Sequence, residues 1–259
     1  MNLSRHLFLI LLLILFISST KRPKKEKLIW SDEFNYTGVV DSTKWNFDQG
    51  NGCPQLCGWG NNEAQIYTTN KENIRVENGL LIIEAKKNDN QWTSARINSR
   101  KKMTFTYGRI EFRAKLAEGL GSWSALWMLG ESVSSKSWPA CGEIDVMEHV
   151  GKFPGVIQSA MHTSFSNGET GNKGSTKIGS YNQFHVYEAL WTSKSIQFFV
   201  DGINYYTYQP LEINEKTWPF DSPFFIIMNL AMGGNFGGPT IDSTLTHARM
   251  EVDYVRVYQ

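Results

Sequence analysis

The segment YGRIEFRAKL at residues 107–116 alternates between apolar and charged side chains. Ile110, Phe112, Ala114 and Leu116 fall on one side, and the charged residues between them fall on the other. Successive side chains of a β-strand point to opposite faces, so this period of two predicts a strand with one buried and one solvated face. Such strands have to bury their apolar side against a second layer, which favours a β-sandwich.

Further strands and tight turns follow the same pattern along the chain. Asn78-Gly79 and Asp201-Gly202 lie between apolar runs, as in two-residue β-hairpins. No segment carries a long helical stripe of apolar residues, and no internal repeat or long linker follows Lys27. We therefore expect one all-β domain over residues 28–259, folded as an antiparallel sandwich.

The composition fits one large β-domain and argues against several kinds of partner. The chain has 259 residues, of which 41% are hydrophobic and 13% aromatic, which is ample for one core. The aromatic surplus also suits stacking on sugar rings, although a sandwich core must account for most of it. From Leu28 onward, 20 basic residues face 24 acidic ones, a net charge of −4. This mildly acidic body has no basic patch, which argues against nucleic acid and gives no support for a sulfated polyanion.

Residues 1–20 resemble a secretory signal peptide. An apolar run at residues 7–17 follows Arg5 and is too short to span the ~30 Å core of a bilayer. Residues 21–27 form a basic linker with more positive charge than the segment before the run, which disfavours export of the chain beyond it. We expect a cleaved signal and a secreted monomer without stable membrane association; a retained N-terminal anchor is the alternative.

The three cysteines give one candidate pair. Cys53 and Cys57 flank PQL in a glycine-rich loop, and in an exported protein they can close a disulfide. The C-x-x-x-C spacing alone is a weak metal signal. Cys141 is expected to be unpaired, and Asn35 in NYT is a sequon for glycosylation if the host glycosylates.

Three carboxylates crowd into the apolar segment CGEIDVMEHVG at residues 141–151. In a regular strand Glu143 and Asp145 share a face, whereas Glu148 has the parity of Ile144 and points into the core. A buried unpaired carboxylate is costly. The segment therefore requires a one-residue β-bulge near Met147, a turn, or a buried acid.

Two carboxyl groups on one face suit glycoside hydrolysis. A separation of about 5–5.5 Å supports retention of configuration, and about 6.5–9.5 Å leaves room for an inverting water. Five regular strand steps would separate the Cα atoms of Glu143 and Glu148 by roughly 16 Å, so only a curved or bulged strand brings them together. Asp145 between them would push their pKa values apart. An acid-rich, solvated strand face is the alternative.

The block GEIDVMEHVG resembles the signature of glycoside hydrolase family 16. Its E-x-D-x-x-E form is typical of laminarinase-like endo-β-1,3-glucanases, whereas lichenases carry E-x-D-x-E. Other blocks match in family order across residues 28–259: LIWSDEFN, WGNNEAQIYT, SARINSR, YGRIEFRAKL, GSWSALWMLG, FHVYEALWT, WPFDSPFFIIMNLAMGGNFGG and VDYVRVYQ. The resemblance implies a curved antiparallel β-jelly-roll sandwich, concanavalin A-like, with an open concave cleft.

The same resemblance implies roles for individual residues. Glu143 matches the nucleophile, Glu148 the general acid/base and Asp145 the assisting acid between them. Substrate-binding positions are matched by Asn62, Glu63, Arg96, Trp123, Trp127, Trp138, His162 and Asn229. His162 matches a histidine beside the acid/base. Several of these residues have an alternative interpretation without a role in binding. Arg96 can be a surface charge on a strand, Trp127 and Asn229 can be core residues, and His162 can be a structural histidine.

Many family members bind Ca²⁺ away from the chemistry. The matching ligands are Glu33, the carbonyl of Gly79, and Asp253, with solvated carboxylates as the alternative. The resemblance implies no cofactor for catalysis and gives such an ion a stabilising role.

Taken together, the residues and the resemblance predict a secreted, retaining endo-β-glucanase acting on β-1,3-linked glucan such as laminarin. Within the enzyme class, the alternatives are a mixed-linkage β-1,3-1,4-glucanase, an enzyme for another glucan or galactan, and a transglycosylase. Outside it, the alternative is a non-catalytic β-glucan-binding protein, a kind that typically lacks the catalytic acids. All three acids are present here.

Overall fold

The computed structural model describes residues 26–259, which form two facing β-sheets. The predicted signal peptide lies outside the described residues, and so does all of the predicted linker except Glu26 and Lys27. The boundaries predicted for the catalytic domain stay a prediction. Of the helices between residues 26 and 259, none reaches the length and hydrophobicity that a bilayer span requires.

Sheet A has ten strands. In spatial order they are β16 (Ile203–Tyr208), β15 (Ile196–Val200), β14 (His185–Trp191), β9 (Gly108–Lys115), β18 (His247–Tyr258), β5 (Leu80–Asn88), β6 (Gln91–Ser94) and β3 (Gln65–Tyr67), with β1 (Leu28–Asp32) beside β18 and β4 (Ile74–Glu77) beside β5.

Sheet B has eight strands. In spatial order they are β13 (Asn172–Lys177), β12 (Val156–His162), β11 (Glu143–Val150), β10 (Ser122–Gly130), β17 (Phe224–Met232), β7 (Arg96–Asn98) and β2 (Asn46–Asp48), with β8 (Thr104–Phe105) beside β17. The short helices are α1 (Gly234–Gly237) and the 3₁₀ turns η1 (Cys57–Gly60), η2 (Glu131–Ser134) and η3 (Gly168–Thr170).

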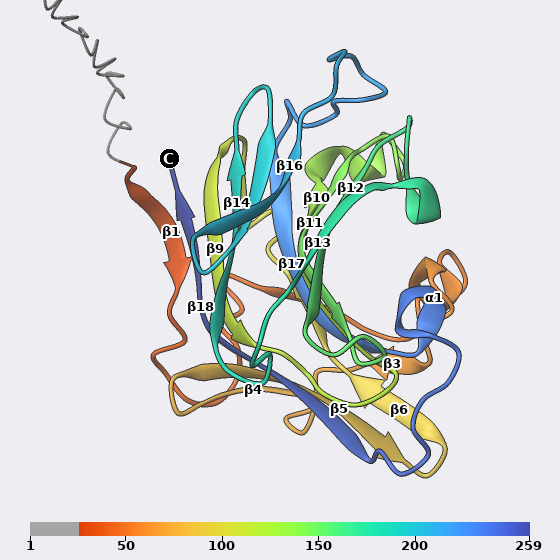
Figure 1. Ribbon diagram of the computed structural model, residues 1–259. Coiled ribbons are helices and arrows are strands. Elements are labelled where there is room, and N and C mark those ends of the chain that lie inside the picture. The colour runs from red at the N-terminus through yellow and green to blue at the C-terminus, as the bar shows by residue number, and fades with distance from the viewer. Residues whose placement is uncertain (1–25) are drawn as a thin grey trace, which may run out of the picture.

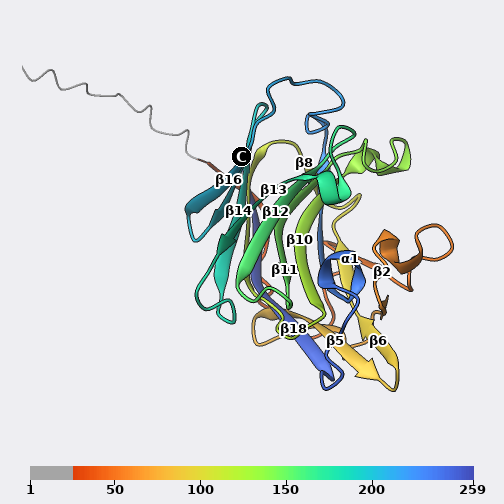
Figure 2. The same cartoon turned by 45° about the vertical axis from the view of Figure 1, so that its right-hand side comes forward.

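The expected antiparallel sandwich is confirmed, with one exception in its pairing. Every strand pair is antiparallel except β3 and β6, which run parallel. The first and last described strands lie side by side, because β1 pairs with β18 and Lys27 exchanges two backbone hydrogen bonds with Gln259 (Figure 1). The strands β10 to β13 of sheet B bend together (Figure 2).

The core lies between the two sheets and follows the alternation read from the sequence. Ile110, Phe112, Ala114 and Leu116 are all buried, as the period of two predicted. They pack in one cluster with buried side chains from both sheets. The turns Asn78-Gly79 and Asp201-Gly202 join β4 to β5 and β15 to β16, and both residues of each turn have positive φ, as type I′ hairpins require.

The edge strand β13 depends on a glycine at its contact with sheet A. A Cβ atom added to Gly174 would lie 2.3–2.5 Å from ring and Cβ atoms of Tyr206. We expect Gly174→Ala to lower the free energy of unfolding by about 1–3 kcal/mol, because the ring or the strand must move. Gly179→Ala is the matched control: it meets no atom within 4 Å, and its change should stay within about 0.5 kcal/mol. Urea denaturation of both variants measures this, and equal stabilities would contradict it.

Candidate functional site

A β-bulge in β11 brings the three carboxylates to one face of sheet B. The pairing of β11 with β10 and with β12 shifts by one residue between Asp145 and Glu148. Val146 and Met147 both pack in the core, so the strand uses two consecutive residues on its inner side. Glu148 thereby returns to the face of Glu143 and Asp145, and the bulge predicted near Met147 is confirmed.

The cross-strand register places one side chain from each of seven strands in a row across this face. From one edge of sheet B to the other, the row consists of Asp48, Arg96, Asn229, Ala125, Glu148, Gln158 and Ser175. Directly opposed residues have Cβ atoms about 4.5–5.5 Å apart, so the row forms a continuous strip. The acids lie inside a mostly polar surface that runs perpendicular to the strands.

His162 lies beside Glu143 and Asp145. Its Nδ1 accepts a hydrogen bond from the backbone N–H of Gly168 at 3.0 Å, so the proton of the neutral imidazole is on Nε2. Nε2 is 3.0 Å from Oδ2 of Asp145 and 3.6 Å from Oε1 of Glu143. The histidine was expected beside Glu148; its close contacts are at the other end of the strand, because it stands directly opposite Glu143 in β12.

The same three side chains have the residue types of a metal site. Their donor atoms lie within 4.8 Å of one another. A metal ion would need Nε2 of His162 without its proton, yet Nδ1 already accepts from Gly168. A neutral imidazole cannot leave both nitrogens unprotonated. We therefore read this group as an acid pair beside a histidine, whose Nε2 is close to Oδ2 of Asp145 without the angle of a hydrogen bond.

Glu148 is held from two sides. The indole Nε1–H of Trp123 donates to Oε1 at 3.0 Å, and Nε2 of Gln158 lies 3.4 Å from Oε2. Glu148 is buried, whereas Glu143 is partly exposed. These contacts orient the carboxyl group and leave it more enclosed than Glu143.

Burial raises the pKa of all three carboxyl groups above their ordinary values. For Glu143 and Glu148 the negative charge of Asp145 adds to burial, and His162 acts in the opposite direction. For Asp145 burial is the cause. Three enclosed carboxyl groups on one face resist simultaneous ionisation, so we expect at least one to keep its proton near neutral pH.

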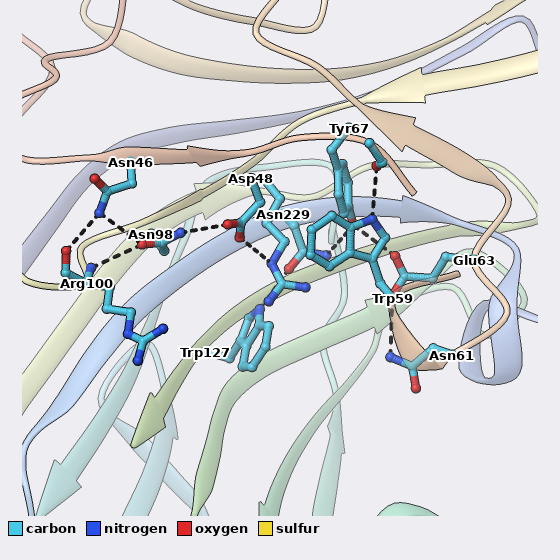
Figure 3. A network of polar contacts seen from close by, with 12 residues as sticks. Asn46, Asp48, Trp59, Asn61, Glu63, Tyr67, Asn98, Arg100, Trp127 and Asn229 are labelled. Carbon is cyan, nitrogen blue, oxygen red and sulfur yellow. Dashed lines mark hydrogen bonds and ion pairs between the residues drawn. The ribbon is translucent and has the colours of Figure 1, made fainter. Parts of the chain in front are cut away.

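Arg96 lies over the indole rings of Trp59 and Trp127, both labelled in Figure 3. Its guanidinium carbon is 4.7 Å from the ring centroid of Trp59 and 4.9 Å from that of Trp127. Nε of Arg96 is 2.9 Å from Oδ2 of Asp48. The guanidinium group is thus fixed by stacking and charge, which gives this end of the row a rigid set of donors.

A second set of polar contacts surrounds Glu63 (Figure 3). Its Oε2 accepts from Nε2 of Gln65 at 2.6 Å and from the phenol of Tyr67 at 3.0 Å. The same phenol oxygen accepts from Nδ2 of Asn229, whose Oδ1 accepts from Nε1 of Trp127 at 2.7 Å. The chain of contacts links the loop before β3 to the strands that carry the row.

Comparison with known proteins decides the family. The model of glycosyl hydrolases family 16 matches residues 61–256. The chain belongs to this family. It is therefore a glycoside hydrolase, and the three acids lie in its family signature.

Three relatives illustrate the similarity. A laminarinase structure from Flavobacterium sp. UMI-01 is 47% identical, with a TM-score of 0.87, and the match covers 90% of this chain and 100% of that one. A β-glucanase of Rhodothermus marinus is 43% identical over 93% of this chain and 87% of its own length. Glucan endo-1,3-β-glucosidase A1 of Niallia circulans is 41% identical over 90% of this chain and 38% of its own length. The structural match confirms the expected curved jelly-roll sandwich.

The remaining positions predicted from the family 16 signature are near the acids or at the rim. Trp123 is 9% exposed. Its ring packs edge-on against Phe236, and its Nε1–H donates to Glu148. Trp138 is 45% exposed, and its ring centroid lies 5.9 Å from that of His162. Asn62 is exposed and donates to Oδ1 of Asn235 at 2.8 Å.

These positions bear on two of the alternatives. Arg96 is no plain surface charge, because its guanidinium lies over two indole rings. Trp127 and Asn229 are joined by a hydrogen bond and lie outside the core cluster between the sheets, and their binding role stays a prediction.

Sequence reasoning missed several side chains of this site. Trp59, Tyr67, Asp48 and Gln158 were not singled out, although all four contact predicted residues. The sequence did indicate the position of Gln158, because alternation along VIQSAMH places it on the same face as His162. Trp59 had none, since its approach to Arg96 depends on the path of the loop.

The side chains expected to bind Ca²⁺ are engaged by arginines. Both carboxylate oxygens of Glu33 accept from Arg256, at 2.9 and 2.8 Å, and Asp253 pairs with Arg113. Gly79 is in the turn between β4 and β5, where its φ is 76°. The carboxylates as arranged do not fit a calcium site, because an ion would have to displace a bidentate arginine pair.

Tyr67 and Tyr187 offer a matched test of the polar network. Both are buried, but the Tyr67 phenol bridges Glu63 and Asn229, whereas the Tyr187 hydroxyl has no hydrogen-bond partner among the described residues. We expect Tyr67→Phe to cost about 1–3 kcal/mol of unfolding free energy, because two buried polar groups lose their partner. Tyr187→Phe should be neutral or stabilising. Chemical denaturation of the two variants measures the difference, and a larger loss for Tyr187→Phe would contradict the network.

Proposed function

We propose that this chain is a secreted, retaining endo-β-glucanase that hydrolyses β-1,3-glucosidic bonds of laminarin-type glucan. The observation that carries the chemistry is the bulge in β11, which presents Glu148 on the same face as Glu143 and Asp145. The linkage is supported by relatives named laminarinase and glucan endo-1,3-β-glucosidase.

The environments of the two glutamates support different roles. Glu143 is the more exposed and has the Nε2–H of His162 nearby, which favours its ionised form. Glu148 is the more enclosed, and burial raises the pKa of both glutamates to about 8, so exposure and not the pKa distinguishes them. Together with the match to the family signature, this favours Glu143 as nucleophile and Glu148 as general acid/base, with Asp145 tuning both.

The reaction proceeds by double displacement. A carboxylate oxygen of Glu143 bonds to the anomeric carbon as the glycosidic C–O bond breaks, and Glu148 gives its proton to the departing sugar oxygen. Glu148 then takes a proton from water, whose oxygen attacks the anomeric carbon and releases Glu143. Both steps use only these side chains and water.

The aromatic and polar row supplies the binding surface. Arg96, which lies over Trp59 and Trp127, offers guanidinium N–H groups to sugar hydroxyls. Trp127 and the exposed Trp138 flank the acids on opposite sides and offer faces for sugar rings. Asn62 and Glu63 contribute from the loop before β3.

Export has separate support. Cys53 and Cys57 form a disulfide, and Cys141 is a buried free cysteine. Disulfides persist in oxidising compartments, which agrees with the secretion predicted from residues 1–20.

A polysaccharide panel tests the substrate. We expect new reducing ends and short oligosaccharides from laminarin, weaker cleavage of lichenan, and none of agarose or carrageenan. Cleavage of lichenan but not laminarin would overturn the linkage and leave the chemistry intact. Products longer than the starting oligosaccharide would identify a transglycosylase, and an inverted anomer in the first product would overturn double displacement.

Replacing the nucleophile separates catalysis from binding. Glu143→Gln should lower kcat on laminarin by about 10⁴- to 10⁶-fold, because no carboxylate is left to attack the anomeric carbon. Oligosaccharide binding, measured by calorimetry, should persist. Glu118→Gln, at an exposed glutamate, is the control and should leave kcat unchanged. Full activity in Glu143→Gln would remove Glu143 from its role.

Neutralising Asp145 should move the whole pH profile to lower pH. Its negative charge raises the pKa of Glu143 and of Glu148, so Asp145→Asn lowers both. The acidic limb follows ionisation of Glu143 and the alkaline limb follows proton loss from Glu148, so both limbs shift in the same direction. The measurement is kcat/KM against pH, with Asp242→Asn, at an exposed turn, as control. Unshifted limbs would mean that Asp145 carries no charge in the working enzyme.

A further inference from the structure

The carbonyl group of Val146 lies at the bulge. Val146 has no Cα partner in the register of β11 with β10 or with β12. Where a bulge disrupts the ladder, a side-chain donor can bind the local carbonyl. Here the hydroxyl of Ser159 donates to it at 2.7 Å, and Ser159 is fully buried in β12.

A tyrosine from the other sheet completes this contact. Ser159 has a single hydroxyl proton, which it gives to Val146, so its oxygen accepts from the phenol of Tyr205 in β16. Burial raises the pKa of Tyr205, which keeps the phenol a donor. The hydrogen bonds therefore run from sheet A through Ser159 to the backbone of the catalytic strand.

The position of this contact relates it to Glu148. Val146 precedes Glu148 by two residues, and Gln158, the neighbour of Ser159, lies against the Glu148 carboxyl. One segment of β12 thus contacts both the backbone of the bulge and the side chain that the bulge redirects. Loss of the Ser159 hydroxyl would remove this hydrogen bond from the bulge and favour a shift of the strand there.

We propose that Ser159 and Tyr205 are positioning residues, which fix the bulge and thereby the direction of Glu148. The inference rests on the acid/base role proposed for Glu148. It predicts that losing either hydroxyl impairs the proton-transfer steps more than binding or nucleophilic attack.

The experiment compares Ser159→Ala and Tyr205→Phe with a matched control. Tyr206→Phe removes the same hydroxyl from the next residue of β16, whose ring stacks on Phe198 and whose hydroxyl makes no hydrogen bond within residues 26–259. Each variant is assayed on laminarin and on an aryl β-1,3-glucoside with a good leaving group. The aryl assay is run with and without sodium azide, which attacks the glycosyl-enzyme without needing a general base.

The expected result is a selective loss. Ser159→Ala should lower kcat on laminarin by about 10- to 100-fold with KM nearly unchanged, because general acid catalysis is impaired. On the aryl substrate azide should restore most of the rate, and the alkaline limb of the pH profile should move. Tyr205→Phe keeps the Ser159 donor and should show the same pattern more weakly, and Tyr206→Phe should match the parent enzyme.

Glu148→Ala in the same assays separates the two hypotheses. If azide restores its aryl activity and Ser159→Ala and Tyr205→Phe behave as the parent enzyme, the positioning inference is overturned and the role of Glu148 stands. Equal losses on both substrates without azide rescue would also overturn it, since they indicate general destabilisation. If Glu148→Ala itself lacks rescue, the acid/base role falls, and the inference falls with it. Should Ser159→Ala fail to fold, Tyr205→Phe decides alone.

Discussion

The structure depends on one departure from regular strand geometry, the extra residue in β11. Without it, Glu148 would point into the core with Ile144, where an ionisable group is costly. With it, Val146 and Met147 both fill the core, and the outer face gains a third carboxyl group. A local change in pairing thus satisfies the packing between the sheets and creates the site at the same time. Bulges are often found beside active sites for this reason.

Enclosure of the acids gives them their chemistry. A rigid sheet holds Glu143, Asp145 and Glu148 close together and away from water, so their pKa values rise and become interdependent. The Nε2–H of His162 faces one end of this group and the indole N–H of Trp123 the other. The two glutamates therefore differ in their neighbouring donors and in their exposure, although they lie on one strand.

The sequence predicted features that depend on local pattern and missed those that depend on register. Alternation along residues 107–116 identified a strand and its buried face, and the wrong parity of Glu148 by itself required an irregularity in the strand. The contact of Trp59 with Arg96 and of Asp48 with Arg96 joins segments that no local pattern connects. The sequence predicted His162 beside Glu148, whereas its closest acidic neighbours are Asp145 and Glu143. Its partner depends on how β11 and β12 align. The arginine pairs of Glu33 and Asp253 were missed for the same reason.

The row of side chains across sheet B has a consequence for how such enzymes diversify. Each strand contributes one position, and the outermost, Asp48 in β2 and Ser175 in β13, belong to strands at the edges of the sheet. Ser175 lies two strands from Glu148 and outside the core cluster, whereas Asp48 is tied to the site through its ion pair with Arg96. Under the proposed function, evolution can therefore change polymer preference most freely from the β13 edge of the sheet.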